Sequence, residues 1–285
     1  MTDVMQACAP PLLERAIGEL RVSFKPSTTG TALQALRQSG CLRARFPRRL
    51  LPDWMDVVLL NTSGGIAGGD RLDLAFAVEA NASATIAAQA AERFYRCVPG
   101  GGPSVVRTSV TVAPGGSAEW LPQETILFDG SRLDRRLDVS VAGEARFLGV
   151  ETLVFGRTAM GEVVRDAWVR DVIRVRRNGA LLLHDAVRLD GPVNTLMRRA
   201  AVGDGGRAVA TVVYVAPDAE SRLDPVRSAL DDRGGDGAGD VAASAWNGML
   251  IARIVGADGA SLRREILRVL SALRDQRPLP RVWMC

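Results

Sequence analysis

The sequence predicts a mainly β protein, and three observations carry that prediction. Large apolar residues fall on every second position in several short segments, among them 72–78, 106–112 and 137–141. Such alternation buries one face of an extended strand. Gly, Pro and Asn punctuate these segments, and helical periodicity is concentrated towards the C-terminal end. Many short strands separated by turns are typical of a body built of β-sheet.

Further short apolar runs extend the strand prediction along the chain. Between two of them, Asn178-Gly179 predicts a type I′ hairpin turn, because both residues tolerate positive φ. No repeat is regular enough in sequence to establish a solenoid. The additional predicted strands are centred on 84–88, 125–128, 147–150, 172–176, 181–183 and 209–215.

Helical spacing is clearest near the C-terminus. Ser261 is expected to cap that helix, because its hydroxyl can accept from a free backbone N–H. A second helix is expected at 192–201 or 221–230. The apolar face of the last helix is predicted to consist of Leu262, Ile266, Leu270 and Leu273, with Val269 beside them.

The chain is expected to form a single domain over residues 1–285, with two flexible segments. Residues 1–14 are expected to be flexible. The stretch 231–240 is rich in Asp and Gly and has too little apolar surface to offset its ordering entropy. It is therefore predicted to be a mobile loop.

Composition narrows the possible function classes. Hydrophobic residues make up 47% of the chain, and the formal net charge is +4 with a pI of about 9.2. The arginines are scattered among nearly as many acids, and Lys25 is the only lysine. This pattern lacks the basic stripe of a nucleic-acid interface, so no nucleic-acid partner is expected.

Cysteine usage and hydropathy indicate a cytoplasmic protein. The four cysteines lie far apart and form no CxxC pair, which disfavours a disulfide framework. Residues 1–11 do not resemble a secretory signal, and no window approaches the ~18 apolar residues of a membrane span. No membrane partner is expected.

The glycine cluster 64–69 raises the question of a phosphate-binding loop. Its outer glycines have the Walker spacing, but Asp70 and Arg71 follow where that loop needs Lys and Ser or Thr. Ile66 occupies the position of the second glycine of a Rossmann motif. A tight turn is therefore predicted, in which Asp70 either caps backbone amides, the favoured alternative, or attracts a cation.

Titratable residues leave two kinds of site open. His184 is the only histidine, which excludes multi-histidine metal sites and favours a hydrogen-bonded structural role for this residue. Carboxylates beside apolar runs must be exposed, paired or functional. They fit either a transient path for a divalent cation or a network of salt bridges with arginine. The acids in question are Asp53, Asp70, Glu92, Glu119, Glu124, Glu151, Glu162, Asp166, Asp171 and Asp185.

Six segments, taken in order along nearly the whole chain, carry a more specific pattern. They read Gln-Ser-Gly-Cys-Leu at 38–42, Asn-Thr-Ser-Gly-Gly-Ile-Ala-Gly-Gly-Asp at 61–70, Ala-Ala-Glu-Arg-Phe-Tyr-Arg-Cys at 90–97, Glu-Trp-Leu-Pro-Gln-Glu-Thr-Ile-Leu-Phe at 119–128, Gly-Arg-Thr-Ala-Met-Gly-Glu at 156–162 and Leu-Pro-Arg-Val-Trp at 279–283. The set resembles the UreD (UreH) urease accessory proteins. The run at 119–128 is a very specific match.

That resemblance implies both a fold and a function. The implied fold is a β-rich superhelical, β-helix-like domain with about two α-helices towards the C-terminal part. The implied function is that of a non-enzymatic scaffold, which binds apo-urease together with UreF and the GTPase UreG. Such a scaffold facilitates nickel insertion into the urease metallocentre through an acid-lined internal channel. Nickel is then cargo in transit, and no permanently bound cofactor is expected.

The resemblance also implies which acids line the channel. Asp70, Glu151 and Asp185 match positions implicated in the nickel path, while Glu162 and Glu124 match other recurrent acids of the family. An adaptor that recruits UreF and UreG to apo-urease without touching nickel is the alternative function. A hydrolase is the third, and it would have to use the single histidine.

In two places the chain departs from the family pattern. Glu92 stands where the family has Ser or Thr, and it either adds an acid to the channel or pairs with Arg93. Cys97 stands where the family has Ser, and it either adds a soft ligand or fills space as a small hydrophobe.

Overall fold

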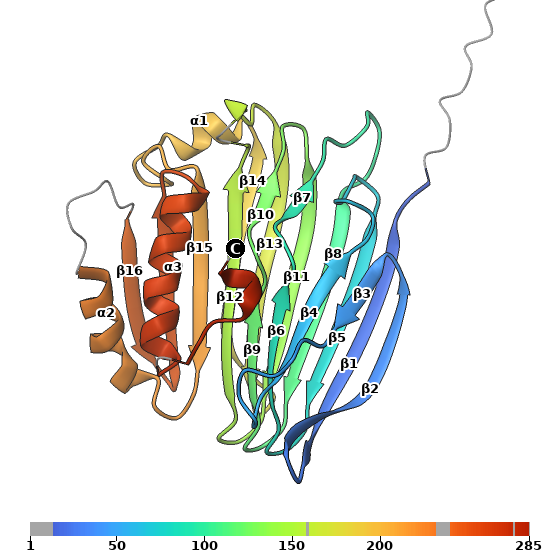
Figure 1. Cartoon of the computed structure of the whole chain (residues 1–285). Helices are drawn as coiled ribbons and strands as arrows, with labels where there is room; N and C mark the ends of the chain where they lie inside the picture. Colours follow the sequence, from blue (N-terminus) through green and yellow to red (C-terminus); the bar gives the residue numbers. More distant parts are fainter. Residues whose placement is uncertain (1–13, 158–159, 232–239, 276, 285) are drawn as a thin grey trace, which may run out of the picture.

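The computed structural model describes residues 14–157, 160–231, 240–275 and 277–284. Within these ranges the chain folds into two mixed β-sheets that face each other, with helices on one side (Figure 1). The seven-stranded sheet has the order β14 (Ala180–Gly191), β13 (Ala167–Arg177), β11 (Arg132–Val141), β8 (Ser104–Val112), β5 (Arg71–Val78), β1 (Ile17–Ser27) and β2 (Gly30–Gly40).

The second sheet is ten-stranded within the described residues. Two short strands, β10 (Thr125–Leu127) and β7 (Glu92–Phe94), pair with each other, and β10 also pairs with β12, off the main path. The main path has the order β16 (Val241–Trp246), β17 (Met249–Gly256), β15 (Ala208–Val215), β12 (Arg146–Phe155), β9 (Ser117–Leu121), β6 (Ser83–Ala88), β4 (Met55–Asn61) and β3 (Leu42–Arg45).

The central strands alternate between the two sheets in chain order. Leaving out the two short strands β7 and β10, the chain passes from β4 to β5, β6, β8, β9, β11, β12 and β13. It changes sheet at each of these steps. These central strands are therefore parallel to their neighbours, in the orders β5–β8–β11–β13 and β4–β6–β9–β12. Parallel neighbours need long crossovers, and here each crossover is a strand of the opposite sheet. This alternating path between two sheets confirms the expected β-rich, β-helix-like fold.

Local predictions are mostly confirmed in this part of the chain. The turn between β13 and β14 is the two-residue Asn178-Gly179 hairpin, with φ values of 51° and 81°. The sequence analysis did not predict the strands β1, β2, β3, β4, β7, β9, β16 and β17. Nearly all of the predicted flexible segments 1–14 and 231–240 lie outside the described residues, namely 1–13 and 232–239.

Helices cover the outer face of the ten-stranded sheet at one end. In Figure 1, α2 (Leu223–Asp231) and α3 (Gly259–Leu273) lie over β15, β16 and β17, opposite the edge formed by β1 and β2. A short helix, α1 (Val193–Met197), and two 3₁₀ turns, η2 (Glu220–Arg222) and η3 (Arg281–Trp283), complete the helical structure of the described residues. Helix therefore forms within or close to both segments expected to hold the second helix.

The helix α3 buries its predicted face but begins earlier than predicted. Leu262, Ile266 and Leu270 are buried against the sheet. The N-cap is Asp258, which accepts from the backbone N–H of Ser261 at 2.7 Å, while the Ser261 hydroxyl accepts from the Asp258 N–H at 3.1 Å. The prediction of Ser261 as the cap is wrong, because Ser261 is the third helical residue of a reciprocal capping box.

Two apolar layers result from this arrangement. One lies between the sheets and the other between the ten-stranded sheet and the helices. Strand β12 contributes to both, since Phe147 and Leu153 point between the sheets while Leu148 and Val150 point towards the helices. Side chains of a strand alternate between its faces, so Glu151 points between the sheets.

Candidate functional site

A row of polar side chains crosses the apolar layer between the sheets. It consists of Arg135 from β11, Glu151 from β12, Asp171 from β13, Asp185 from β14 and Thr211 from β15. All five are buried, and each occupies an inward-facing position whose neighbours two residues away belong to the same apolar layer. Strand pairing aligns Arg135 with Asp171 and Glu151 with Thr211. The row is therefore set by the register of the two sheets.

Arg135 lies at the centre of this row between two carboxylates. Its Nε and Nη2 donate to the two oxygens of Asp171 at 2.8 and 2.6 Å. Its Nη1 donates to the Thr125 hydroxyl at 2.7 Å, and Nη2 also donates to the Thr152 carbonyl at 3.3 Å. The Glu151 Oε2 lies 2.7 Å from Nη1 as an ion pair, although among the described residues this oxygen accepts no hydrogen bond.

The protonation of Glu151 depends on how Arg135 divides its contacts between Glu151 and Asp171. Burial raises the pKa of Glu151 to about 7. The guanidinium of Arg135 lowers that pKa, the carboxylate of Asp171 raises it, and the Trp120 indole N–H, which donates to Oε1 at 2.8 Å, lowers it again. One buried positive charge serves two carboxylates, and Asp171 holds its two-atom contact.

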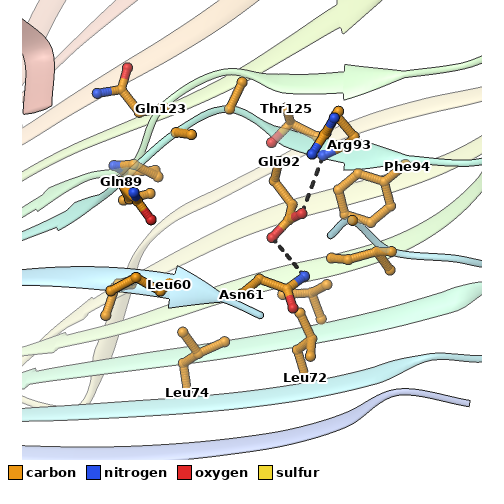
Figure 2. Close-up of a pocket in the computed structure, with 18 of the residues that line it drawn as sticks. Leu60, Asn61, Leu72, Leu74, Gln89, Glu92, Arg93, Phe94, Gln123 and Thr125 are labelled. Atoms are coloured by element: carbon orange, nitrogen blue, oxygen red, sulfur yellow. Dashed lines mark hydrogen bonds between the residues drawn. The ribbon is translucent and has the colours of Figure 1, made fainter. Parts of the chain in front are cut away.

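A cavity of about 290 Å³ lies on one side of this ion-pair cluster. Arg135 and Glu151 line it. Apolar side chains such as Leu72 and Leu74 form another part of its wall (Figure 2). Glu92 contributes a further carboxylate, which accepts from the Asn61 amide at 3.1 Å. Burial raises the pKa of Glu92. The remaining polar groups of the wall are Gln89, Arg93, Thr108, Gln123 and Thr125.

A second, small cavity of about 20 Å³ is lined by Glu151, Asp171, Asp185 and Thr211. Glu151 lines both cavities, so the ion-pair cluster borders both spaces. Asp185 accepts from the Thr211 hydroxyl at 3.3 Å and forms an ion pair with Arg253, whose side chain is 55% exposed. The polar row therefore connects the first cavity with the surface at Arg253.

Asp70 makes different contacts from the acids of the polar row. It is buried, and its two oxygens accept from the backbone N–H groups of Ala16 at 2.8 Å and Ala67 at 2.7 Å. The glycine turn before it is confirmed, with φ values of 78° at Gly64 and 137° at Gly65. Capping of backbone amides, the favoured alternative from the sequence, accounts for both oxygens of Asp70.

The other two acids implied by the resemblance also lie outside the cavities. Glu124 pairs with Arg263 of α3 at 3.0 Å. Glu162 pairs with Arg157 at 2.8 Å and accepts from the backbone N–H of Asp129 at 3.2 Å. The structure thus brings Glu151 and Asp185 together and leaves Asp70, Glu124 and Glu162 at separate structural contacts.

The remaining candidate groups from the sequence lie away from this site. His184 is exposed on β14, where the residue that follows it, Asp185, points inward. Cys41 and Cys97 are buried free thiols, and neither lines one of the two cavities. In the part of the chain that the structure describes, no group of three or more His, Cys, Asp or Glu side chains is arranged to hold a metal ion.

Sequence reasoning missed the residues at the centre of the site. Arg135 was not considered, and Asp171 was only one of ten acids near strands. The sequence does contain a signal for Arg135. In β11 every second residue faces the apolar layer, and Arg135 occupies one of these positions between Leu133 and Leu137. A charged residue at an inward-facing position of an alternating strand must be paired, so the alternation alone identifies Arg135 as a candidate.

No helix in the described part of the chain is both long and apolar enough to span a membrane.

Comparison with known proteins gives a consistent result. A family model described as UreD urease accessory protein matches residues 16–284. The urease accessory protein UreD of Azorhizobium caulinodans is 41% identical over 273 residues, covering 96% of this chain and 98% of that protein. The UreD proteins of Dinoroseobacter shibae and a Methylobacterium species are 44% and 43% identical, covering 96% of this chain and 94% and 96% of their own lengths. The chain belongs to the UreD family of urease accessory proteins.

Proposed function

We propose that this chain is a non-enzymatic scaffold in urease maturation, which conducts nickel between its two sheets to apo-urease. The observation that carries the proposal is the polar row, which includes Glu151 and Asp185 and runs from the cavity that Glu92 also lines to the surface at Arg253. A buried row of carboxylates in an apolar core costs stability, so it calls for a functional reason.

The chemistry of the row suits a cation in transit. Its ligands are carboxylate, hydroxyl and carbonyl oxygens, which hold divalent cations without the tight thiolate or imidazole cage of a permanent site. Glu151 and Asp185 are the two family acids that line the row. Asp70, Glu124 and Glu162 serve the proposed passage only by holding the fold around it.

The proposed partners are apo-urease, UreF and the GTPase UreG. A scaffold that delivers a metal must contact the recipient enzyme and the source of the metal, and the curated relatives are named urease accessory proteins. We place the complex in the cytoplasm, where thiols such as those of Cys41 and Cys97 stay reduced. Nickel is the cargo, and no cofactor is proposed to reside in the chain.

A pair of substitutions tests the passage against a purely structural adaptor. Glu151→Gln combined with Asp185→Asn removes two charges from the row and nearly preserves side-chain volume. The matched control is Glu19→Gln with Asp138→Asn, which removes the same kinds of charge from the outer face of the seven-stranded sheet. Both proteins are assayed for pull-down of UreF, UreG and apo-urease, and for nickel-dependent and GTP-dependent urease activation.

If nickel moves through the passage, Glu151→Gln/Asp185→Asn should form intact complexes and activate urease at least tenfold more slowly. Glu19→Gln/Asp138→Asn should leave activation unchanged. Intact complexes with unchanged activation in the first variant would instead establish the adaptor.

A further inference from the structure

The guanidinium of Arg135 occupies a cage of oxygen atoms. The cage is made by Glu151 Oε2 at 2.7 Å, both Asp171 oxygens at 2.6 and 2.8 Å, the Thr125 hydroxyl at 2.7 Å and the Thr152 carbonyl at 3.3 Å. Carboxylate, hydroxyl and carbonyl oxygens are also the donors that surround divalent cations in proteins. The arginine therefore fills a place that matches a metal ion in charge and in ligand type.

One oxygen of this cage is left without a hydrogen bond. Glu151 is 4% exposed, and its Oε2 lies 2.7 Å from Nη1 of Arg135 without the geometry of a hydrogen bond, so among the described residues it is held by an ion pair alone. A badly directed contact satisfies a buried carboxylate oxygen less well than a directed hydrogen bond does. A spherical divalent cation has no such directional requirement and would satisfy this oxygen together with those of Asp171.

The cage also lies between the two cavities. Arg135 and Glu151 line the cavity of about 290 Å³, whereas Glu151 and Asp171 line the small one. A cation that moves from the first cavity to the second must pass the guanidinium. Two positive charges in a desolvated site repel each other far more strongly than in water.

We propose that Arg135 is the gate of the passage: its side chain holds the site of a divalent cation in the resting chain, and cations pass only when it withdraws. This inference rests on the proposed function. The large cavity lies beside the guanidinium and has room to receive it. The second arginine of the row, Arg253, is more than half exposed, so water screens its pair with Asp185 and leaves Arg135 as the main barrier.

The test is nickel binding to the purified full-length chain, measured by isothermal titration calorimetry with NiCl₂. Arg135→Met removes the charge and keeps much of the side-chain length. We expect it to bind one nickel ion at least tenfold more tightly than the wild type. Adding Glu151→Gln and Asp171→Asn should abolish that gain. Arg135→Lys retains a positive charge and should bind no better than the wild type.

Folding of Arg135→Met is measured in parallel, because its two carboxylates lose their counterion. If the variant unfolds in EDTA, we expect Ni²⁺ to restore its circular dichroism spectrum and to raise its Tm with increasing nickel concentration. The triple variant has no charge in the cage and should fold with or without nickel.

The outcome separates this proposal from the proposed function. A folded Arg135→Met chain without tighter nickel binding would overturn the gate, as would an unfolded one that nickel does not rescue while the triple variant folds. Tighter binding by Arg135→Met, combined with normal urease activation by Glu151→Gln/Asp185→Asn, would support the caged site and reject the passage.

Discussion

Arg135 contacts Asp171 through two nitrogen atoms, at 2.8 and 2.6 Å, and this two-point pair joins neighbouring strands β11 and β13. Glu151 comes from the opposite sheet and contacts the same guanidinium through one nitrogen. The guanidinium also donates to the Thr125 hydroxyl and the Thr152 carbonyl of that sheet, so the two sheets stay linked without the Glu151 contact. Changes at Glu151 should alter the chemistry of the site more than the pairing of strands.

The pH dependence of stability should report on Glu151. Its pKa is about 7 in the folded chain, against an ordinary value of 4.5. Between these two pH values the folded state binds a proton that the unfolded state has lost, so the free energy of unfolding falls as the pH rises. At about 1.4 kcal/mol per pKa unit, the loss is on the order of 2–3 kcal/mol.

Urea unfolding of the wild type and Glu151→Gln at pH 4.5, 6 and 7.5 measures this effect. The difference in the free energy of unfolding between the two proteins should shift against the wild type as the pH rises. Parallel pH profiles for the two proteins would contradict the raised pKa.

A second buried cluster should contribute to stability alone. Glu119 is 1% exposed and accepts from Arg274 at 2.9 and 3.0 Å, from Arg277 at 2.8 Å and from the Thr85 hydroxyl at 2.7 Å. It fixes the C-terminal segment to β9. Glu119→Gln leaves a buried arginine without its counterion, so we expect a loss of about 3 kcal/mol in urea unfolding. Glu19→Gln, at an exposed pair, should leave the midpoint unchanged.

Sequence alone predicted the strand faces better than the strand neighbours. Alternation in 72–78, 106–112 and 137–141 identified inward-facing positions, and the structure confirms those strands. The pairing of Arg135 with Asp171 could not be predicted in this way. Their strands are separated in sequence by β12 of the other sheet, and no regular repeat gives the register across that crossover.

The missed strands and the misplaced helix cap have separate physical causes. In β1 the alternation of Leu20, Val22 and Phe24 is present in the sequence and was overlooked. Strand β2 is an edge strand whose residues 34–40 are exposed on both faces, so burial imposes no pattern on them. Both Asp258 and Ser261 are good capping residues, and only the reciprocal contact reveals which one is the cap.

The glycine turn beside the first cavity should show a steep difference between adjacent positions. A Cβ on Gly65 would lie 2.4 Å from the Tyr95 ring and 3.0 Å from the Arg93 carbonyl, at a φ of 137°. A Cβ on Gly64 would meet nothing within 4 Å, at a φ of 78°. Gly64→Ala should therefore cost about 1 kcal/mol from backbone strain, and Gly65→Ala at least about 3 kcal/mol.

Urea unfolding of the two alanine variants gives both values. Equal losses at Gly64 and Gly65 would mean that the Tyr95 ring moves aside, and that packing at this turn is not restrictive.

Asp70 should respond to substitution in the opposite way from the acids of the passage. Its carboxylate accepts from the N–H groups of Ala16 and Ala67, so Asp70→Ala leaves two amides without their acceptor. We expect a loss of about 2 kcal/mol in urea unfolding, with urease activation per folded molecule unchanged. Glu151→Gln/Asp185→Asn should instead slow activation while its complexes stay intact. An Asp70→Ala chain of unaltered stability that fails to support activation would assign Asp70 to the nickel path, because only a role in transfer separates activity from folding.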